Sequence, residues 1–196
     1  MYTDDLVEVR IHGRGGQGAV LAASLAAEVA FEGGYYPQAF PFFGAEKRGA
    51  PVAAFLRYSS SLLMPRCRIY EPFCVVLFDT KSLPPEIVLD GLKEKGILLL
   101  NTAGENVSFW RNAAGERKLY TVDASHIAVN YGLISSGMPL ISSVMLGALV
   151  KILDLASLEV LQQTLKGKIS RFERENIECA RQGYEEVKEV FPDVEC

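Results

Sequence analysis

The chain has 196 residues, 49% of them hydrophobic, which predicts one globular domain, residues 1–196, with a single sizeable core. Its formal net charge is −4, from 20 basic and 24 acidic residues without a long run of either sign, so we expect no nucleic-acid partner. Because we find no basic leader segment and no uncharged apolar run of about 18 residues, we expect no membrane span and a cytoplasmic location.

The first part of the chain alternates between strand and helix patterns. A β-branched run at residues 7–11 predicts a strand, and the alanine-rich residues 19–31 predict a buried helix that ends at Gly33. We expect a short second strand at residues 35–38, a loop at 39–49 and a third strand at 51–58. No helix pattern precedes the third strand, so part of the sheet is expected to be mixed.

The later elements complete an α/β pattern. Apolar runs predict strands at residues 74–78, 97–101 and 119–122, and a helix at 85–95. Residues 106–115, which contain Trp110, fit either an exposed loop anchor or a hairpin edge. Further helices are expected at residues 127–131, with Ser125 as N-cap, and at 142–153, 157–165 and 169–191. These elements predict a Rossmann-like, doubly wound, mostly parallel sheet with helices on both faces and a helical C-terminal segment.

A glycine-rich loop joins the first strand to the first helix, at residues 12–18 (HGRGGQG). Its spacing is that of the dinucleotide-binding loops, whose glycines let the backbone approach a phosphate at a helix start. A dinucleotide site also needs an acidic residue after the second strand, and residues 36–41 offer none. The loop therefore contacts some phosphate or a partner chain, or its glycines only allow close packing. Its candidate residues are Gly13, Arg14, Gly15, Gly16, Gln17 and Gly18.

A second dense segment lies at residues 39–52 (AFPFFGAEKRGAPV). Three phenylalanines stand beside one acidic and two basic residues, which is too apolar for a free loop and too charged for a core. The composition fits an interface, or a loop folded back over its own core. The candidate residues here are Phe43, Gly44, Glu46, Arg48 and Gly49.

Together these two segments resemble the gamma subunit, or gamma domain, of the pyruvate and other 2-oxoacid:ferredoxin oxidoreductases. Weaker matches follow in the same order, at residues 69–72, 78–79, 99–102, 122–124 and 143–148. The resemblance implies a complex that converts a 2-oxoacid, with pyruvate expected first, and coenzyme A to acyl-coenzyme A and carbon dioxide. It also implies alpha, beta and delta partner subunits and ferredoxin as the electron acceptor.

The same resemblance places the cofactors on other chains: thiamine diphosphate with magnesium between alpha and beta, and iron–sulfur clusters on delta. This sequence agrees, since it has no G-D-G motif for thiamine diphosphate. Its four cysteines, Cys67, Cys74, Cys179 and Cys196, lack the close spacing of a cluster or zinc site, and we expect free thiols. We therefore expect no cofactor, metal ligand or catalytic residue on this chain alone.

The remaining hypothesis concerns what a gamma subunit does. The glycine loop and the loop from Phe43 to Arg48 would face the catalytic subunits and help to wall the active-site cleft or the coenzyme A channel. Arg14, Lys47 and Arg48 suit phosphate groups, and they suit carboxylates of a partner equally well. His12 and His126 are expected to be structural, each with a hydrogen bond.

Three alternatives stay open at this point. The chain could be a free-standing nucleotide-binding oxidoreductase, although the missing acidic residue argues against it. It could be a gamma-type subunit for another acid, such as 2-oxoglutarate, indolepyruvate or oxalate. It could also be a non-catalytic Rossmann-like interaction domain.

Overall fold

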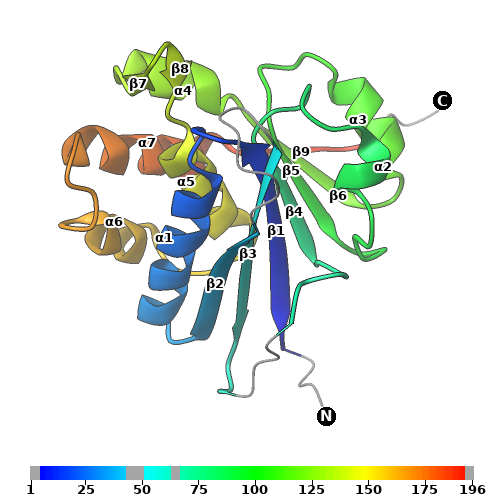
Figure 1. Ribbon diagram of the computed structural model, residues 1–196, viewed down its shortest axis with the longest axis horizontal. Helices are drawn as coiled ribbons and strands as arrows, with labels where there is room; N and C mark the ends of the chain where they lie inside the picture. Colours follow the sequence, from blue (N-terminus) through cyan, green and yellow to red (C-terminus); the bar gives the residue numbers. More distant parts are fainter. Residues whose placement is uncertain (1–4, 43–50, 63–66, 193–196) are drawn as a thin grey trace.

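The computed structural model describes residues 5–42, 51–62 and 67–192. Its centre is a seven-stranded sheet in the order β2-β3-β1-β4-β5-β6-β9 (Figure 1). The strands are β1 (Val7–Arg14), β2 (Tyr36–Phe42), β3 (Pro51–Ser59), β4 (Cys74–Leu77), β5 (Ile97–Asn101), β6 (Lys118–Val122) and β9 (Lys188–Val190). A separate hairpin joins β7 (Ile134–Ser135) to β8 (Met138–Pro139).

The sheet is mixed, as expected from the missing helix before the third strand. Strands β1, β4, β5 and β6 run parallel to one another, whereas β3 pairs antiparallel with both β1 and β2, and β9 pairs antiparallel with β6. Helical crossovers link β4 to β5 and β5 to β6, whereas the first helix and the antiparallel pair of β2 and β3 lie between β1 and β4 in the chain. Antiparallel pairing occurs towards the two edges of the sheet. The predicted α/β, mostly parallel fold is thereby confirmed.

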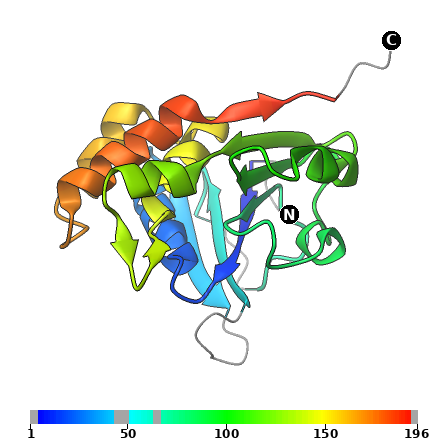
Figure 2. The same ribbon diagram turned by 90° about the horizontal axis from the view of Figure 1, so that it is seen from above.

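Helices lie on both faces of the sheet (Figure 2). One face carries α1 (Ala19–Glu32), α4 (Ala124–Asn130), α5 (Ser142–Ile152), α6 (Leu158–Leu165) and α7 (Glu173–Glu186). The other face carries α2 (Pro85–Val88) and α3 (Val107–Ala114), whose apolar side chains pack against β4, β5 and β6, and Arg10 of β1 donates to the carbonyl of Val88 at the end of α2. In the described part of the chain, no helix covers the second face of β2 and β3.

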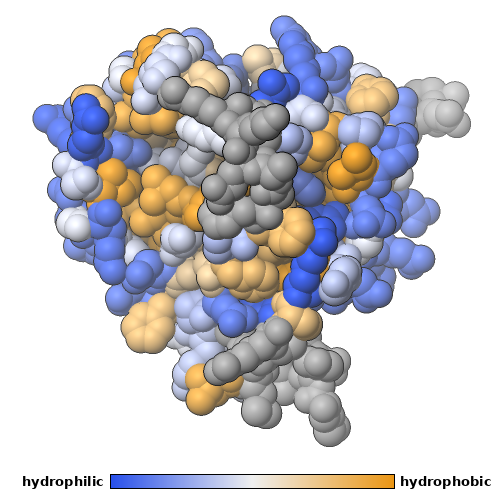
Figure 3. Space-filling view, viewed as in Figure 1, coloured by the Kyte–Doolittle hydropathy of each residue, from blue (hydrophilic) through white to orange (hydrophobic). Residues whose placement is uncertain are grey.

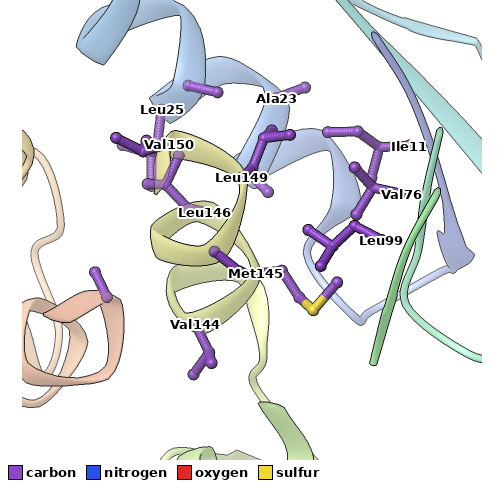
Figure 4. Packing of buried hydrophobic residues seen from close by; sticks show 14 of the residues in the cluster. Ile11, Ala23, Leu25, Val76, Leu99, Val144, Met145, Leu146, Leu149 and Val150 are labelled. Carbon is purple, nitrogen blue, oxygen red and sulfur yellow. The ribbon is translucent and has the colours of Figure 1, made fainter. Parts of the chain in front are cut away.

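The main core lies between α5, α1 and the central strands (Figure 4). It brings together Met145, Leu146 and Leu149 of α5, Ala23 and Leu25 of α1, and the strand residues Ile11, Val76 and Leu99. All are nearly or completely buried, so truncating one leucine to alanine is expected to cost about 2–5 kcal/mol. This core holds β1 and the start of α1 in place, and therefore the glycine loop between them.

Two glycines allow α5 and α7 to cross at short range. A Cβ atom added to Gly147 would lie 1.9 Å from the carbonyl oxygen of Ala180, and one added to Gly183 would lie 2.0 Å from that of Val144. Neither distance is possible for a real side chain. The backbones of the two helices therefore touch only because both positions are glycine.

Two predictions about helices were wrong. The helix expected at residues 85–95 ends at Val88, because Gly91 takes a left-handed φ of +67° and packs its Cα against the carbonyl of Tyr70. The last helix does not reach residue 191: α7 ends at Glu186, and β9 then adds the final strand to the sheet.

Three further details differ from the sequence-based expectation. Residues 107–114 form the helix α3, and its Trp110 is buried in the second core rather than exposed. Strand β2 continues to Phe42, so the first residues of the expected loop belong to the sheet. The N-cap of α4 is Asp123, whose carboxylate accepts a hydrogen bond from the backbone N–H of His126 at 3.0 Å.

None of the helices described is both long and apolar enough to cross a membrane. Within residues 5–42, 51–62 and 67–192, no group of three or more histidine, cysteine or acidic side chains could hold a metal ion. Cys67, Cys74 and Cys179 are free thiols.

Candidate functional site

The glycine loop turns sharply from the end of β1 into α1. Gly16 and Gly18 both adopt left-handed backbone conformations, with φ of +98° and +87°. The Gln17 side chain closes the loop, because its Oε1 accepts a hydrogen bond from the Arg14 N–H at 2.7 Å. A Cβ atom on Gly18 would lie 2.9 Å from that of Ser142, so the loop also packs tightly against the first turn of α5. Close packing is therefore one real role of these glycines.

Arg14 is held by an acidic residue of its own chain. Its Nε lies 2.7 Å from Oδ2 of Asp79, and the two side chains are 43% and 22% exposed. Such a partly exposed pair contributes at most about 1 kcal/mol to stability. A phosphate could therefore displace Asp79 at little cost in free energy. Without such a ligand, the Arg14 guanidinium is already paired with Asp79.

A polar pocket of about 290 Å³ lies beside the loop, at the carboxyl ends of β4, β5 and β6. The crossover after β1 runs over one face of the sheet, and those after β4 and β5 run over the other face. The chain thus switches faces between β1 and β4, which is where ligands bind in open α/β sheets. The pocket is lined by Gln17, Phe78, Asp79, Thr80, Lys81, Asn101, Thr102, Ala103, Glu105, Asp123 and Ser125.

Asn101 ties together the segments that form the pocket floor. Its Nδ2 donates to the carbonyl oxygen of Phe78 at 2.9 Å and to Oγ of Ser125 at 3.0 Å. Its Oδ1 accepts a hydrogen bond from the backbone N–H of Ser125 at 3.2 Å. One amide therefore fixes the ends of β4 and β5 relative to the first turn of α4.

The charges around the pocket nearly balance. Lys81 forms an ion pair with Glu105 at 3.1 Å, as Arg14 does with Asp79, and Asp123 adds a third carboxylate. The pocket therefore offers hydrogen bonds from amide and hydroxyl groups rather than a strong field for anions. This chemistry suits a ligand that places hydroxyl or amino groups inside the pocket and its charged groups at the rim.

Of the pocket residues, the sequence analysis proposed only Gln17 as a site residue; Asp79, Asn101 and Asp123 appeared there only within the weaker family matches. Asp79 lies two residues after the end of β4, Asn101 is the last residue of β5, and Asp123 directly follows β6. The carboxyl ends of neighbouring parallel strands meet at one edge, so polar residues at these positions could have been grouped. What was missing was the strand order that makes β4, β5 and β6 neighbours.

The sheet order also explains why no ribose-binding acidic residue follows the second strand. Strand β3 lies between β1 and β2, so the end of β2 is two strand spacings, roughly 10 Å, from the strand that carries the glycine loop. The parallel neighbour of β1 is β4, and it is followed by Asp79. A standard dinucleotide arrangement is therefore absent from the described sheet.

The candidates Phe43, Gly44, Glu46, Arg48 and Gly49, and also Lys47, lie outside the described residues. The described strands before and after this segment are β2, which ends at Phe42, and β3, which begins at Pro51. Pro51, at the start of β3, pairs with Arg14 at the end of β1. The two predicted site segments thus begin at the same edge of the sheet, and the role of each candidate stays a prediction.

His12 differs from the structural histidine that the sequence suggested. Its side chain is 7% exposed, and its Nε2 has no hydrogen-bond partner in the described part of the chain. Burial, and then the nearby charges of Arg10 and Arg68, lower the pKa of His12 to about 4. The imidazole is therefore neutral at pH 7. His126, on α4, meets Asn130 at 2.9 Å and has a partner, as expected.

Known proteins match this chain over nearly its whole length. The family model described as pyruvate ferredoxin/flavodoxin oxidoreductase matches residues 8–186. Pyruvate synthase subunit PorC of Methanothermobacter marburgensis is 44% identical over 187 residues, which cover 93% of this chain and 98% of that protein. The pyruvate/ketoisovalerate oxidoreductases common subunit gamma of Pyrococcus furiosus is 41% identical, with 95% and 99% covered.

Solved structures agree with this assignment. The crystal structure of pyruvate oxidoreductase subunit PORC from Thermotoga maritima has a TM-score of 0.81 and 36% identity, and covers 96% of this chain and 100% of its own. The same fold occurs in 2-oxoglutarate:ferredoxin oxidoreductase from Magnetococcus marinus, with a TM-score of 0.74 and 19% identity over 92% of this chain and 31% of that one. The resemblance found in the sequence is confirmed: the chain belongs to the pyruvate ferredoxin/flavodoxin oxidoreductase family, as a gamma-type subunit of an oxidoreductase complex.

Proposed function

We propose that this gamma subunit holds no redox cofactor and instead completes the coenzyme A site of a complex that oxidises 2-oxoacids, pyruvate first. The partners in this proposal are alpha and beta chains with thiamine diphosphate and magnesium, a delta chain with iron–sulfur clusters, and ferredoxin as acceptor. Residues 1–196 would act as one gamma-type domain, and its cytoplasmic location stays a prediction. The observation that supports the proposal is the polar pocket beside the glycine loop.

The pocket fits one end of coenzyme A rather than the whole molecule. Its volume, about 290 Å³, is at the lower limit of ligand pockets, roughly 300–1,000 Å³, and coenzyme A is a long, flexible molecule. Gln17, Asn101 and Ser125 can hydrogen-bond hydroxyl or amino groups inside it. Arg14, at the rim, would exchange Asp79 for a phosphate oxygen. The remainder of the coenzyme would extend along a partner chain towards the reacting carbon.

The identity of the acid is proposed to depend on the partner chains. The Pyrococcus furiosus relative is a common gamma subunit of pyruvate and ketoisovalerate oxidoreductases, so one gamma chain serves two acids there. A similar gamma subunit need not contact the variable part of the acid. We propose the same division of labour here, which makes this chain compatible with pyruvate or another 2-oxoacid.

The test is the KM for coenzyme A of the assembled complex carrying Arg14→Ala, Arg48→Ala or Asp79→Asn. Loss of a charge-assisted hydrogen bond to phosphate, about 1.5–3 kcal/mol, should raise KM about 10-fold or more in Arg14→Ala while kcat changes little. Asp79→Asn frees Arg14 and should not raise KM. Lys168→Ala breaks a similarly exposed ion pair with Glu28, outside the pocket, and serves as the control.

An unchanged KM for coenzyme A in both arginine variants would refute the phosphate contact. Micromolar binding of NAD, NADP or FAD to the purified chain would instead favour the free-standing oxidoreductase. These two outcomes are independent, because the KM is measured on the assembled complex and the nucleotide binding on the purified chain alone.

A further inference from the structure

A second cavity, of about 530 Å³, opens on the face of the sheet that carries no described helix over β2 and β3. Its lining residues are Gln38, Ala39, Phe40, Phe42, Phe55, Arg57, Cys67 and Arg68, which we call the helix-free face. Figure 3 shows one side of the molecule, on which hydrophobic and hydrophilic residues lie next to one another. The cavity is larger than the pocket at the glycine loop. It lies over β2 and β3, whereas that pocket lies at the carboxyl ends of β4, β5 and β6.

Aromatic rings and guanidinium groups alternate over this face. The guanidinium of Arg57 lies 5.4 Å from the ring centre of Phe40, and that of Arg68 lies 4.3 Å from the ring centre of Phe42. Phe55 lies beneath both phenylalanines, with ring centres 5.3 and 6.4 Å away. Since the rings are held from below and Phe42 remains 43% exposed, the surface is preformed for contact.

The charge on the helix-free face is positive, although the whole chain has a net charge of −4. Arg57 is paired with Glu8 at 2.8 Å, but Arg10 beside it donates to the backbone carbonyls of Val88 and Asp90 instead of a carboxylate. Arg68 forms no ion pair within the described residues. Burial lowers the pKa of Arg10, the nearby charge of Asp90 raises it, and the charge of Arg68 lowers it again, so the guanidinium groups of Arg10 and Arg68 repel each other. An additional carboxylate placed here would relieve this repulsion.

The edge of β2 is poorly suited to pairing with a strand of another chain. Pro37 and Pro41 have no N–H groups to donate, and prolines of this kind protect edge strands from pairing with another chain. Whatever binds this side of the sheet must use the side chains of the helix-free face. Exposed aromatic and arginine side chains around a cavity are typical of the centre of protein interfaces.

We propose that the helix-free face is the docking surface for a segment of a catalytic partner chain that carries a carboxylate next to a large apolar side chain. The carboxylate pairs with Arg68, and the apolar side chain fills the cavity between Phe40, Phe42 and Phe55. The charge complementarity selects an acidic segment. This inference rests on the proposed function, since the partner is a chain of the same oxidoreductase complex.

Cys67 provides a direct reporter of the bound segment. It is an exposed free thiol in the lining of the cavity, whereas Cys74 and Cys179 are buried. The rate of maleimide labelling of Cys67, followed by mass spectrometry of its peptide, is compared between the purified chain and the assembled complex. Docking predicts at least about 10-fold slower labelling in the complex, because access then requires the partner to dissociate.

Two substitutions on the helix-free face test the proposed docking by a binding measurement. Arg68→Glu and Phe42→Ser should each weaken the binding of this chain to the other subunits at least about 10-fold. Arg68→Lys should lose less binding than Arg68→Glu, because it keeps the positive charge but not the planar group that lies over Phe42. Arg174→Glu and Phe109→Ser make the same chemical changes at exposed positions on α7 and α3, and should leave binding unchanged.

The failures of the two proposals can be told apart. If the complex assembles but Cys67 labels at the same rate as in the free chain, the docking surface is wrong and the proposed function stands. If Arg68→Glu and Phe42→Ser both assemble with wild-type affinity, the docking surface is also wrong. If the chain does not associate with thiamine-binding and iron–sulfur chains at all, both proposals fall.

Discussion

Replacing Asn101 by alanine should weaken both the fold and the pocket. The substitution removes the hydrogen bonds of the amide to the carbonyl of Phe78 and to the backbone N–H and hydroxyl of Ser125. At about 0.5–1.5 kcal/mol each, with partial replacement by water because Asn101 is half-buried, the loss is about 2–3 kcal/mol. For a chain of this length that corresponds to a fall in Tm of about 4–12 °C.

Asn101→Asp should be worse than Asn101→Ala. Its carboxylate can still accept from the N–H of Ser125, but it faces the carbonyl oxygen of Phe78 and joins the three carboxylates already around the pocket. Urea unfolding of the purified chain measures the order, and Asn112→Ala, at an exposed position on α3, is the control. In the complex, Asn101→Ala should also raise the KM for coenzyme A. Stability equal to that of the control would refute the structural role of the amide.

Three further predictions concern stability. Gly183→Ala places a Cβ against the carbonyl of Val144 and should cost about 1–3 kcal/mol or more in urea unfolding, while Glu186→Ala on the same helix should cost little. His12, with a pKa of about 4 in the folded state and about 6.5 when unfolded, stabilises the protein fully above pH 6.5. Below pH 6.5 the unfolded chain binds a proton at His12 more readily than the folded chain, so protonation favours unfolding. The free energy of unfolding of the wild type, relative to that of His12→Leu, should therefore fall by about 2 kcal/mol between pH 7.5 and pH 5. A relative free energy of unfolding that does not change with pH would contradict the burial of His12. Ser157→Ala removes the N-cap of α6, whose Oγ accepts from the Val160 N–H, and should lower Tm by the equivalent of about 1 kcal/mol.

The sequence was sufficient where local patterns decide the structure. The β-branched run, the glycine loop and the alanine-rich helix lie where they were expected, because strand, turn and helix signals follow one another within residues 7–32. The class of the fold followed from the alternation of strands and helices. The resemblance carried by the glycine loop and the segment at residues 39–52 identified the family.

Contacts between distant segments decided what the sequence did not show. Helix α3 has weak local signals, and the burial of Trp110 in the second core, with residues of β4, β5 and β6, accounts for its position. Strand β9 could not be separated from the preceding helix by pattern, because its three residues are specified by pairing with β6. The pocket combines the ends of three strands with the glycine loop, and only the strand order brings those residues together.

The most direct test of the central claim is purification of this chain from its native host under anaerobic conditions, followed by identification of its partners and cofactors. The account predicts that it elutes with a thiamine-binding chain and an iron–sulfur chain, that the complex reduces ferredoxin with pyruvate and coenzyme A, and that the separated chain contains neither iron nor thiamine diphosphate. Elution of the chain alone, or a redox cofactor bound to the separated chain, would contradict it.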